Sequence, residues 1–509
     1  MNSKSFSRSH ICTCLAMAGL LSACGGGHSP TAPLPEAETA TIAPAAPRAG
    51  ITPFIQMLDF KGTGMADVST LHFVIAAKPG TTAAPVDVTY TVAALDKRGY
   101  LTADTLTLPV FGLYANYANQ VSVAMTFKDG STKHWPVTMT SASYTDSTSI
   151  YSAPNILQPR AAGSALGYSY MALKSGLGAP VIIDTDGQIR WVGTGIANSF
   201  STAFYQNAFV MGQAKSTGML IQELDGSTHT LSLQSSTYTN FHHNIDHGKT
   251  GLLAELDALI GGVTTLESNV AEIDTSGAVL KEWNLGTLIS DYMRSQGDDP
   301  SLFVRPGVAD WFHNNATTYD SRDDSVIVSS RENFVIKLDY ATGRIIWIFG
   351  DPTKYWYTFP SLRAKALKLS DGGLYPIGQH GISITSDGLL MLFNDGLGSQ
   401  NQPAGAPAGA SRTYSAVSAY SIDPQAMSAQ EVWTFDHGKT IFSDICSSAY
   451  EGPSKSLLVT YSVADQRSHM RLMGLDANRN IVFDFEYPTI SCNTSWNSLP
   501  MPLDSLKIN

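Results

Sequence analysis

The chain is poor in charge, poor in cysteine and almost without long apolar runs. Charged side chains make up only 15% of its 509 residues, and acids outnumber bases to give a formal net charge of −11. An acidic chain does not attract nucleic acid or an anionic membrane surface through charge, so such partners are excluded. No long amphipathic helix is apparent. Apolar residues nevertheless reach 43%, which is ample material for a large core.

What the chain does contain is a repeat. In each copy an apolar residue precedes an Asp, a turn follows, and an apolar strand that often ends in Trp completes the unit. A repeat of this length with a turn and a strand-ending aromatic residue is typical of propeller blades of about four strands. The sequence therefore predicts an all-β fold with a six-bladed β-propeller over residues 155–509; the alternative is a β-sandwich or several small β domains. The six copies begin at Asp184, Asp225, Asp274, Asp339, Asp423 and Asp476, which lie 41 to 84 residues apart.

The chain before the repeats divides into two parts. Residues 51–154 contain short alternating strands without the repeat, a pattern that predicts a small β-sandwich domain. Residues 24–50 are rich in Gly, Ala, Pro and Thr and are predicted to form a flexible tether.

The N-terminus predicts export. Lys4 and Arg8 precede a short apolar stretch that is too short to span a membrane, and small residues follow it. Leu21-Ser-Ala-Cys24 looks like a bacterial lipoprotein box, which makes residues 1–23 a signal peptide and Cys24 the lipidated residue. The expected location is the bacterial periplasm, with a lipid anchor in the outer membrane as the only membrane contact. An ordinary secretory signal is the alternative.

Only two cysteines, Cys446 and Cys492, remain beyond the predicted anchor. In an oxidising compartment two thiols usually pair, so we expect a disulfide between them. The alternative is two separate buried thiols.

Three histidines occupy the same place in the repeat, each at the start of an apolar strand. They are His243, His313 and His380, and Arg331 follows His313 by 18 residues. If the repeats are arranged radially, equivalent positions converge on one axis. Three imidazoles and a guanidinium would then meet in one cavity, and this combination suits an oxyanion.

A metal site is not expected. His243 and His247 have the four-residue spacing of a zinc pair, but that spacing shares a face only on a helix, whereas here a strand is predicted.

The histidine segments resemble the bacterial arylsulfate sulfotransferases, which are exported six-bladed propellers with a small N-terminal β domain. The resemblance rests on Asp310-Trp-Phe-His-Asn-Asn, on Ser-Val-Ile-Val-Ser-Ser-Arg331 and on Gln379-His380. It implies that His380 is the nucleophile. It further implies that His313, Arg331 and Asn315 belong to the site, Asn315 as a substrate contact, together with His243 or the adjacent His242.

The same residues suit sulfuryl transfer on chemical grounds. Transfer of a sulfuryl group needs in-line positioning and neutralisation of its oxygens, and Arg331 can hold two of them. An imidazole is a competent nucleophile at neutral pH, and neighbouring histidines can exchange protons with phenols. We therefore expect ping-pong transfer from an aryl sulfate to a phenol through a sulfo-histidine, without any cofactor.

Two other functions remain open, and so does the oligomeric state, for which a homodimer is possible. The alternatives are an aryl sulfate hydrolase and a non-catalytic propeller that binds an anion or another protein. A dry aromatic pocket would favour transfer over hydrolysis. Candidate wall residues, which are otherwise blade core, are Trp311, Tyr355, Trp356, Tyr357 and Phe359.

Overall fold

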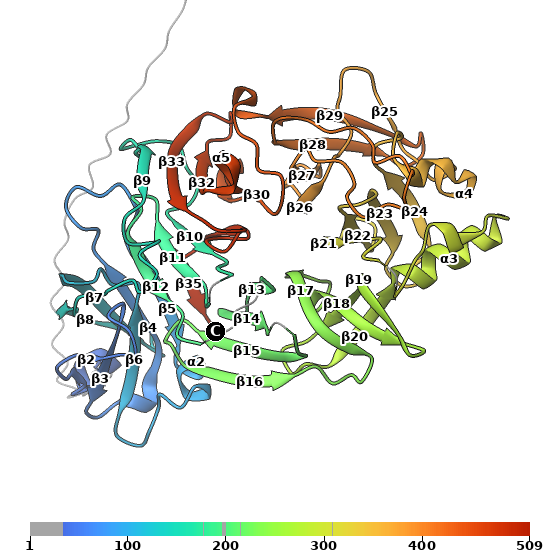
Figure 1. Cartoon of the computed structure of the whole chain (residues 1–509). Helices are drawn as coiled ribbons and strands as arrows, with labels where there is room; N and C mark the ends of the chain where they lie inside the picture. The colour runs from blue at the N-terminus through green and yellow to red at the C-terminus, as the bar shows by residue number, and fades with distance from the viewer. Residues whose placement is uncertain (1–33, 177, 196–199, 214, 308) are drawn as a thin grey trace, which may run out of the picture.

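Six β-sheets follow one another in a ring, as Figure 1 shows for this computed structural model. The structure describes residues 34–176, 178–195, 200–213, 215–307 and 309–509. The predicted signal peptide and Cys24 lie outside these residues. Within them, no helix combines the length and apolarity needed to cross a membrane.

Each sheet of the ring is one antiparallel blade whose innermost strand faces the common axis. Blades 2 to 4 each use four consecutive strands, and blade 5 adds a short parallel strand at its outer edge. Blade 2 contains β13 (Thr202–Tyr205), β14 (Ala208–Gly212), β15 (Gly218–Glu223) and β16 (Thr228–Ser232). Blade 3 contains β17 (Tyr238–His247), β18 (Leu252–Ile260), β19 (Val263–Ile273) and β20 (Val279–Asn284). Blade 4 contains β21 (Asn314–Asp320), β22 (Ser325–Ser330), β23 (Val335–Asp339) and β24 (Ile345–Phe349). Blade 5 contains β25 (Lys368–Leu369), β26 (Gln379–Ile384), β27 (Leu390–Asn394), β28 (Ala416–Asp423) and β29 (Ser428–Phe435).

The ring closes through two strand exchanges between blades 1 and 6. Strand β34 (Ser498–Met501), from near the C-terminus, pairs with β10 and becomes the innermost strand of blade 1. Strand β9 (Asn155–Gln158) pairs with β33 at the outer edge of blade 6. These pairings satisfy backbone groups that would otherwise be exposed at sheet edges. The other strands are β10 (Tyr170–Leu173), β11 (Val181–Asp184) and β12 (Ile189–Val192) in blade 1, and β30 (Ser448–Glu451), β31 (Leu457–Val463), β32 (His469–Leu475) and β33 (Ile481–Pro488) in blade 6.

The six repeated Asp residues lie one per blade, at the turn before the last strand of the repeat. In blade 1, the carboxylate of Asp184 accepts hydrogen bonds from the backbone N–H groups of Asp186 and Gln188. In blade 6, that of Asp476 does the same with Asn478 and Asn480. An Asp side chain stabilises a turn in this way by satisfying N–H groups that the strand ladder leaves free. The predicted propeller of six blades is therefore confirmed.

The N-terminal part forms two sheets that share one apolar core with blades 1 and 2. Phe60, Phe73 and Val123 lie in this core together with Trp191 and Phe209 of the propeller. The first sheet contains β1 (Ala43–Pro44), β2 (Arg48–Ala49), β3 (Ile55–Lys61) and β6 (Leu106–Phe111). The second contains β4 (Val68–Ile75), β5 (Val86–Thr91), β7 (Ala118–Phe127), β8 (Thr132–Thr140) and β35 (Leu506–Ile508).

Both ends of the described chain differ from the sequence expectation. The predicted tether over 24–50 is wrong for its second half, because α1 (Glu36–Thr39), β1 and β2 lie there and Ala37, Ala40 and Ile42 are buried in the core. At the other end, β35 leaves the ring and pairs in parallel with β5 of the N-terminal domain.

One amphipathic helix was missed. Helix α3 (Leu285–Ser295) follows β20 and buries Leu285, Ile289 and Met293 against blades 3 and 4. Asn284 caps it by accepting a hydrogen bond from the N–H of Thr287. The apolar positions recur at helical spacing, but β-branched residues and a glycine mask this short pattern. The remaining helices are α2 (Val92–Lys97), α4 (Pro360–Arg363) and α5 (Ala464–Arg467).

Candidate active site

The three repeat histidines and Arg331 line a single cavity of about 520 Å³. His243 lies in β17, His313 immediately precedes β21, and His380 lies in β26, so each comes from the innermost strand of its blade. Arg331 follows β22 directly, and its backbone N–H donates to the carbonyl of His313. The structure therefore brings together the four residues that the sequence singled out.

A break in the strand ladder aims each histidine at the axis. The pairing register shifts between Phe241 and Ile245, between Asn314 and Ala316, and between His380 and Ser383. His243 and His313 have positive φ angles of 44° and 53°. Such conformations are uncommon for residues other than glycine, and they concentrate where a side chain is redirected for function.

Glycine supplies the same backbone freedom beside His380. Gly381 has a φ of 54°, and a Cβ atom at this position would lie 3.0 Å from the backbone of Ser448 in blade 6. The two blades therefore approach closely at this position, and the positive φ further favours glycine after His380.

His380 is buried and neutral. Its Nδ1 lies 2.9 Å from the carbonyl oxygen of Gly378, so Nδ1 carries the proton and Nε2 carries the lone pair. Burial lowers the pKa of His380 well below its usual range, and the nearby positive charge of Arg331 lowers it further. The imidazole is thus held unprotonated, a state in which its Nε2 can act as a nucleophile.

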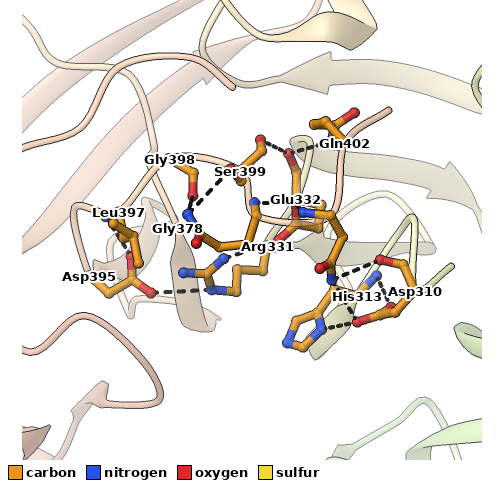
Figure 2. A network of polar contacts seen from close by, with 12 residues as sticks. Asp310, His313, Arg331, Glu332, Gly378, Asp395, Leu397, Gly398, Ser399 and Gln402 are labelled. Atoms are coloured by element: carbon orange, nitrogen blue, oxygen red, sulfur yellow. Dashed lines mark hydrogen bonds and ion pairs between the residues drawn. The ribbon is translucent and has the colours of Figure 1, made fainter. Parts of the chain in front are cut away.

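Two acidic residues flank the Arg331 guanidinium, as Figure 2 shows. Its Nη1 donates to Glu332 at 3.1 Å, and its Nε lies 3.5 Å from Oδ2 of Asp395. The same Asp395 oxygen lies 3.5 Å from Nδ1 of His380. Burial raises the pKa of Asp395 to about 8, although Arg331 opposes the shift. At pH 7 this carboxyl group is therefore mostly protonated, and it does not cancel the charge of Arg331.

His313 differs from His380 in its charge state. Its Nδ1 lies 2.8 Å from Glu267 and also contacts Asp310, which accepts the backbone N–H of His313 as well (Figure 2 shows the Asp310 contacts). Burial alone would lower the pKa of His313, but the two carboxylates outweigh it and raise the pKa to about 10. His313 is therefore an imidazolium at neutral pH.

Glu267 is a cavity residue that the sequence did not reveal. It belongs to β19, has a φ of 45°, and lies where the pairing with β18 is irregular. Burial raises its pKa, but the surrounding histidines more than reverse this and leave the carboxylate ionised. In the sequence, Glu267 is one polar residue within a mixed strand, and no repeat marks it.

Of the adjacent residues His242 and His243, it is His243 whose ring lies next to both His313 and Trp496. Its ring is 4.7 Å from that of His313 and 5.0 Å from that of Trp496. Burial lowers its pKa to about 3, so this imidazole is neutral. His242 also lines the cavity, and its Nδ1 lies 3.0 Å from Nδ1 of His243.

The aromatic wall consists of residues that differ from those expected. Trp311 and Trp356 are buried in the core of blade 4, with Tyr355, Tyr357 and Phe359 packed against them. The cavity is instead bounded by Trp496, whose ring is 5.8 Å from that of His380, and by Phe200, 5.3 Å from Trp496. The segment that carries Trp496 lies outside the repeat, so nothing in the pattern pointed to it.

The disulfide between Cys446 and Cys492 is present, as predicted. Both cysteines line the cavity next to Trp496. The bond links the segment before β30 to the segment that carries Trp496, and so supports the aromatic wall.

Asn315 lies behind the cavity. It is buried, and its side-chain N–H donates to the carbonyl of Gln379, next to His380. Its predicted contact with substrate stays a prediction, since the observed role is to hold β26 against β21.

Comparisons with known proteins agree with the residue pattern. A family model described as Arylsulfotransferase (ASST) matches residues 162–497, and one described as Arylsulfotransferase Ig-like domain matches residues 44–143. Arylsulfate sulfotransferase AssT of Escherichia coli O6:H1 (strain CFT073) is 29% identical over 233 residues, and that of Lelliottia amnigena is 26% identical over 232. Each match covers 36% of this chain and only 38% of the relative.

Two solved structures are similar in outline. They are the β-propeller domain of Cps50 (Swd1) from Myceliophteria thermophila, at 9% identity, and the gluconolactonase XC5397 from Xanthomonas campestris, at 10%. The matches cover 66% and 67% of this chain and 100% and 97% of those chains, with a TM-score of 0.33 in both cases. At such values neither likeness bears on function.

Proposed function

The chain belongs to the arylsulfotransferase family, and from this membership and the geometry of the cavity we propose that it moves a sulfuryl group from an aryl sulfate ester to a phenol. The observation that carries the proposal is that one cavity holds a neutral imidazole beside two cations. His380 is a neutral imidazole with a lone pair on Nε2, while Arg331 and His313 are cations.

In the first half-reaction, Nε2 of His380 attacks the sulfur atom of the donor. The N–S bond forms as the bond between sulfur and the aryl oxygen breaks, and Arg331 stabilises the sulfuryl oxygens. The Nδ1 proton of His313 is held by carboxylates, so Nε2–H is the proton that passes to the leaving phenolate. The products are the free phenol and a sulfo-His380.

The second half-reaction is the reverse with a new phenol. The acceptor oxygen attacks the sulfur atom, its proton returns to Nε2 of His313, and the N–S bond breaks. His380 is restored as the neutral imidazole, so no electron or proton is gained or lost over the cycle.

The cavity wall supports transfer over hydrolysis. Trp496, Phe200 and the disulfide give the cavity an apolar side on which an aryl ring can stack. A bound phenol would exclude water from the sulfo-histidine. A hydrolase, or a propeller that only binds anions, remains the alternative.

One assay separates these functions. A chromogenic aryl sulfate is supplied with and without a phenol acceptor, and both phenol release and the sulfated acceptor are measured. Transfer predicts that added phenol accelerates release and is itself sulfated. Release that is indifferent to phenol would indicate a hydrolase, and no release would indicate a binding protein.

We further propose that the protein works in the bacterial periplasm as a lipoprotein anchored through Cys24. A disulfide between Cys446 and Cys492 is consistent with an oxidising compartment. Mass spectrometry of the N-terminal peptide from membrane fractions tests the anchor, and an unmodified Cys24 in the mature protein would contradict it.

A further inference from the structure

Three possible metal ligands converge at one side of the cavity. Oε2 of Glu267 lies 2.8 Å from Nδ1 of His313 and 3.5 Å from Nδ1 of His243. The three ligand atoms all lie within 4.8 Å of one another. Oε2 of Glu267 is buried and, among the described residues, makes no contact with the geometry of a hydrogen bond.

These distances match those between the ligands of a zinc ion. Zinc binds nitrogen and oxygen at about 2.0–2.2 Å in a tetrahedron, which places neighbouring ligand atoms roughly 3.3 Å apart. The separations of 2.8 and 3.5 Å from Glu267 fall on either side of this value. Two imidazoles and one carboxylate are also a donor set that suits zinc.

A cavity that accepts a sulfuryl group should present positive charge to its oxygens, and Glu267 presents a negative one between two histidines. A divalent cation at this point would be held by the carboxylate and would offset its charge.

Among the residues that the structure describes, two other clusters could compete for the ion. Glu255 lies near His242 and His243, but its carboxylate already accepts the N–H of Asn244 and contacts the hydroxyl of Thr317, and it does not line the cavity. Asp465, His469 and Glu486 form an exposed cluster on blade 6. The Glu255 carboxylate of the first cluster is already hydrogen-bonded within the protein. The second cluster serves as a control in the binding experiment.

We propose that the cavity binds a zinc ion through His243, Glu267 and His313, and that this ion inhibits the reaction. The bound ion would fill part of the cavity that His380 and Arg331 also line, so it would obstruct the aryl sulfate. The inhibition rests on the proposed function, whereas the binding does not.

Binding is measured without turnover. The full-length protein, treated with a chelator and then freed of it, is titrated with Zn²⁺ by calorimetry and with Co²⁺ by visible absorption. We expect one tight site and the d–d bands of a four- or five-coordinate ion. Glu267→Gln should weaken binding at least about 10-fold, since it replaces a charged ligand by a neutral amide.

Two variants serve as controls, and circular dichroism establishes that every variant is folded. His469→Asn removes the exposed cluster and should leave the affinity unchanged. His380→Asn lies outside the ligand set, so it should keep the metal site while losing transfer. If Glu267→Gln does not fold, His313→Ala tests the same ligand set.

The expected functional result is inhibition of wild-type transfer by Zn²⁺ at the concentration that fills the site, reversed by chelator. The absence of a tight site, or binding lost in His469→Asn and kept in Glu267→Gln, would overturn the proposal. Metal binding by a protein that transfers no sulfuryl group would leave the site standing and reject only the proposed function.

Discussion

Oε2 of Glu267 lies 2.8 Å from Nδ1 of His313, although the two residues belong to different blades. This contact, together with that of Asp310, makes His313 an imidazolium while His243 and His380 stay neutral. Three chemically identical side chains thus have two charge states in one cavity. The neighbouring carboxylates, rather than the histidines themselves, decide which of them can donate a proton.

Neutralising Glu267 should change the pH dependence of donor cleavage. The carboxylate raises the pKa of His313, so Glu267→Gln lowers that pKa from about 10. The alkaline limb of kcat should then move down by about 1 to 3 pH units, most visibly for donors whose leaving phenols have a high pKa. The measurement is a pH–rate profile. Glu223→Gln, on β15 of blade 2, disrupts an ion pair with Arg98 of the N-terminal domain; it is the control and should leave the limb in place.

Replacing the proposed nucleophile should abolish both half-reactions. We expect His380→Asn to lower the rate of donor cleavage by about 10³-fold or more, because no other side chain has a lone pair in the same place. An Asn amide can still donate to the carbonyl of Gly378, so thermal unfolding should change little. Mass spectrometry after a brief exposure to donor alone should find the sulfuryl group on the peptide that contains His380. A label on another histidine would show that the nucleophile has been misassigned.

The negative charge of Asp395 should weaken substrate binding, and only at alkaline pH. Its pKa is about 8 in the folded protein against 3.8 for the free side chain, so it is mostly protonated at pH 7 and becomes an anion beside Arg331 above pH 8. The KM for an aryl sulfate should therefore rise above pH 8 in the wild type and stay flat in Asp395→Asn. Asp387→Asn, at an exposed pair with Lys455, is the matched control. A large loss of activity for Asp395→Asn at pH 7 would contradict this assignment.

The same shift has a consequence for stability. Because the folded state binds the Asp395 proton more tightly than the unfolded state, this group favours folding fully below pH 3.8. Its contribution is lost progressively as the pH rises from there to about 8. The free energy of unfolding of Asp395→Asn should therefore fall less than that of the wild type over this range, as measured by urea denaturation.

Removing the disulfide should destabilise the protein. Cys446 and Cys492 are 46 residues apart, and a cross-link over such a loop contributes roughly 4 kcal/mol in the chain-entropy model. The double variant Cys446→Ala/Cys492→Ala should lower the free energy of unfolding by about this amount in a chemical denaturation experiment. Thiol titration of the denatured, unreduced wild type should find neither cysteine free, and two free thiols would refute the bond.

Trp496 should govern the affinity for the aryl group. Trp496→Leu removes a ring that lies beside His243 and His380, and an aromatic pair of this kind contributes about 0.5–1.5 kcal/mol. We expect the KM for aryl sulfates to rise about 2- to 10-fold with kcat less affected. Trp433→Leu, on β29 of blade 5, should leave KM unchanged. An equal rise in KM for both variants would mean that the effect does not depend on contact with the aryl group.

The sequence revealed the parts of the site that the repeat carries. The Asp turns mark the blades because each blade needs the same turn, and His243, His313 and His380 share a position because the innermost strands are equivalent. Arg331 is identified in the same way. It directly follows β22, and β22 pairs with β21, the strand that begins after His313.

The residues that were missed depend on contacts between distant segments. Glu267 reaches the cavity only because a local irregularity in β19 turns its side chain inward, and no strand pattern encodes this. Trp496 comes from the irregular segment before β34, where it is positioned by a disulfide and by strand exchange. The ordered start of the N-terminal domain was missed for a similar reason: residues 34–50 have the composition of a linker, and they are ordered by pairing with β3 and by burial in the shared core.

The strand exchange at the ring closure also sets the order in which the protein can mature. The innermost strand of blade 1 is β34, so that blade lacks its axial strand until residues 498–501 have left the ribosome and, if the chain is exported, crossed the membrane. Trp496 and Cys492 arrive in the same final stretch. A nascent chain can therefore contain His243, His313, Arg331 and His380 in folded blades and still have no finished cavity. Its chemistry would begin only once the segment that carries Trp496 and β34 has closed the ring.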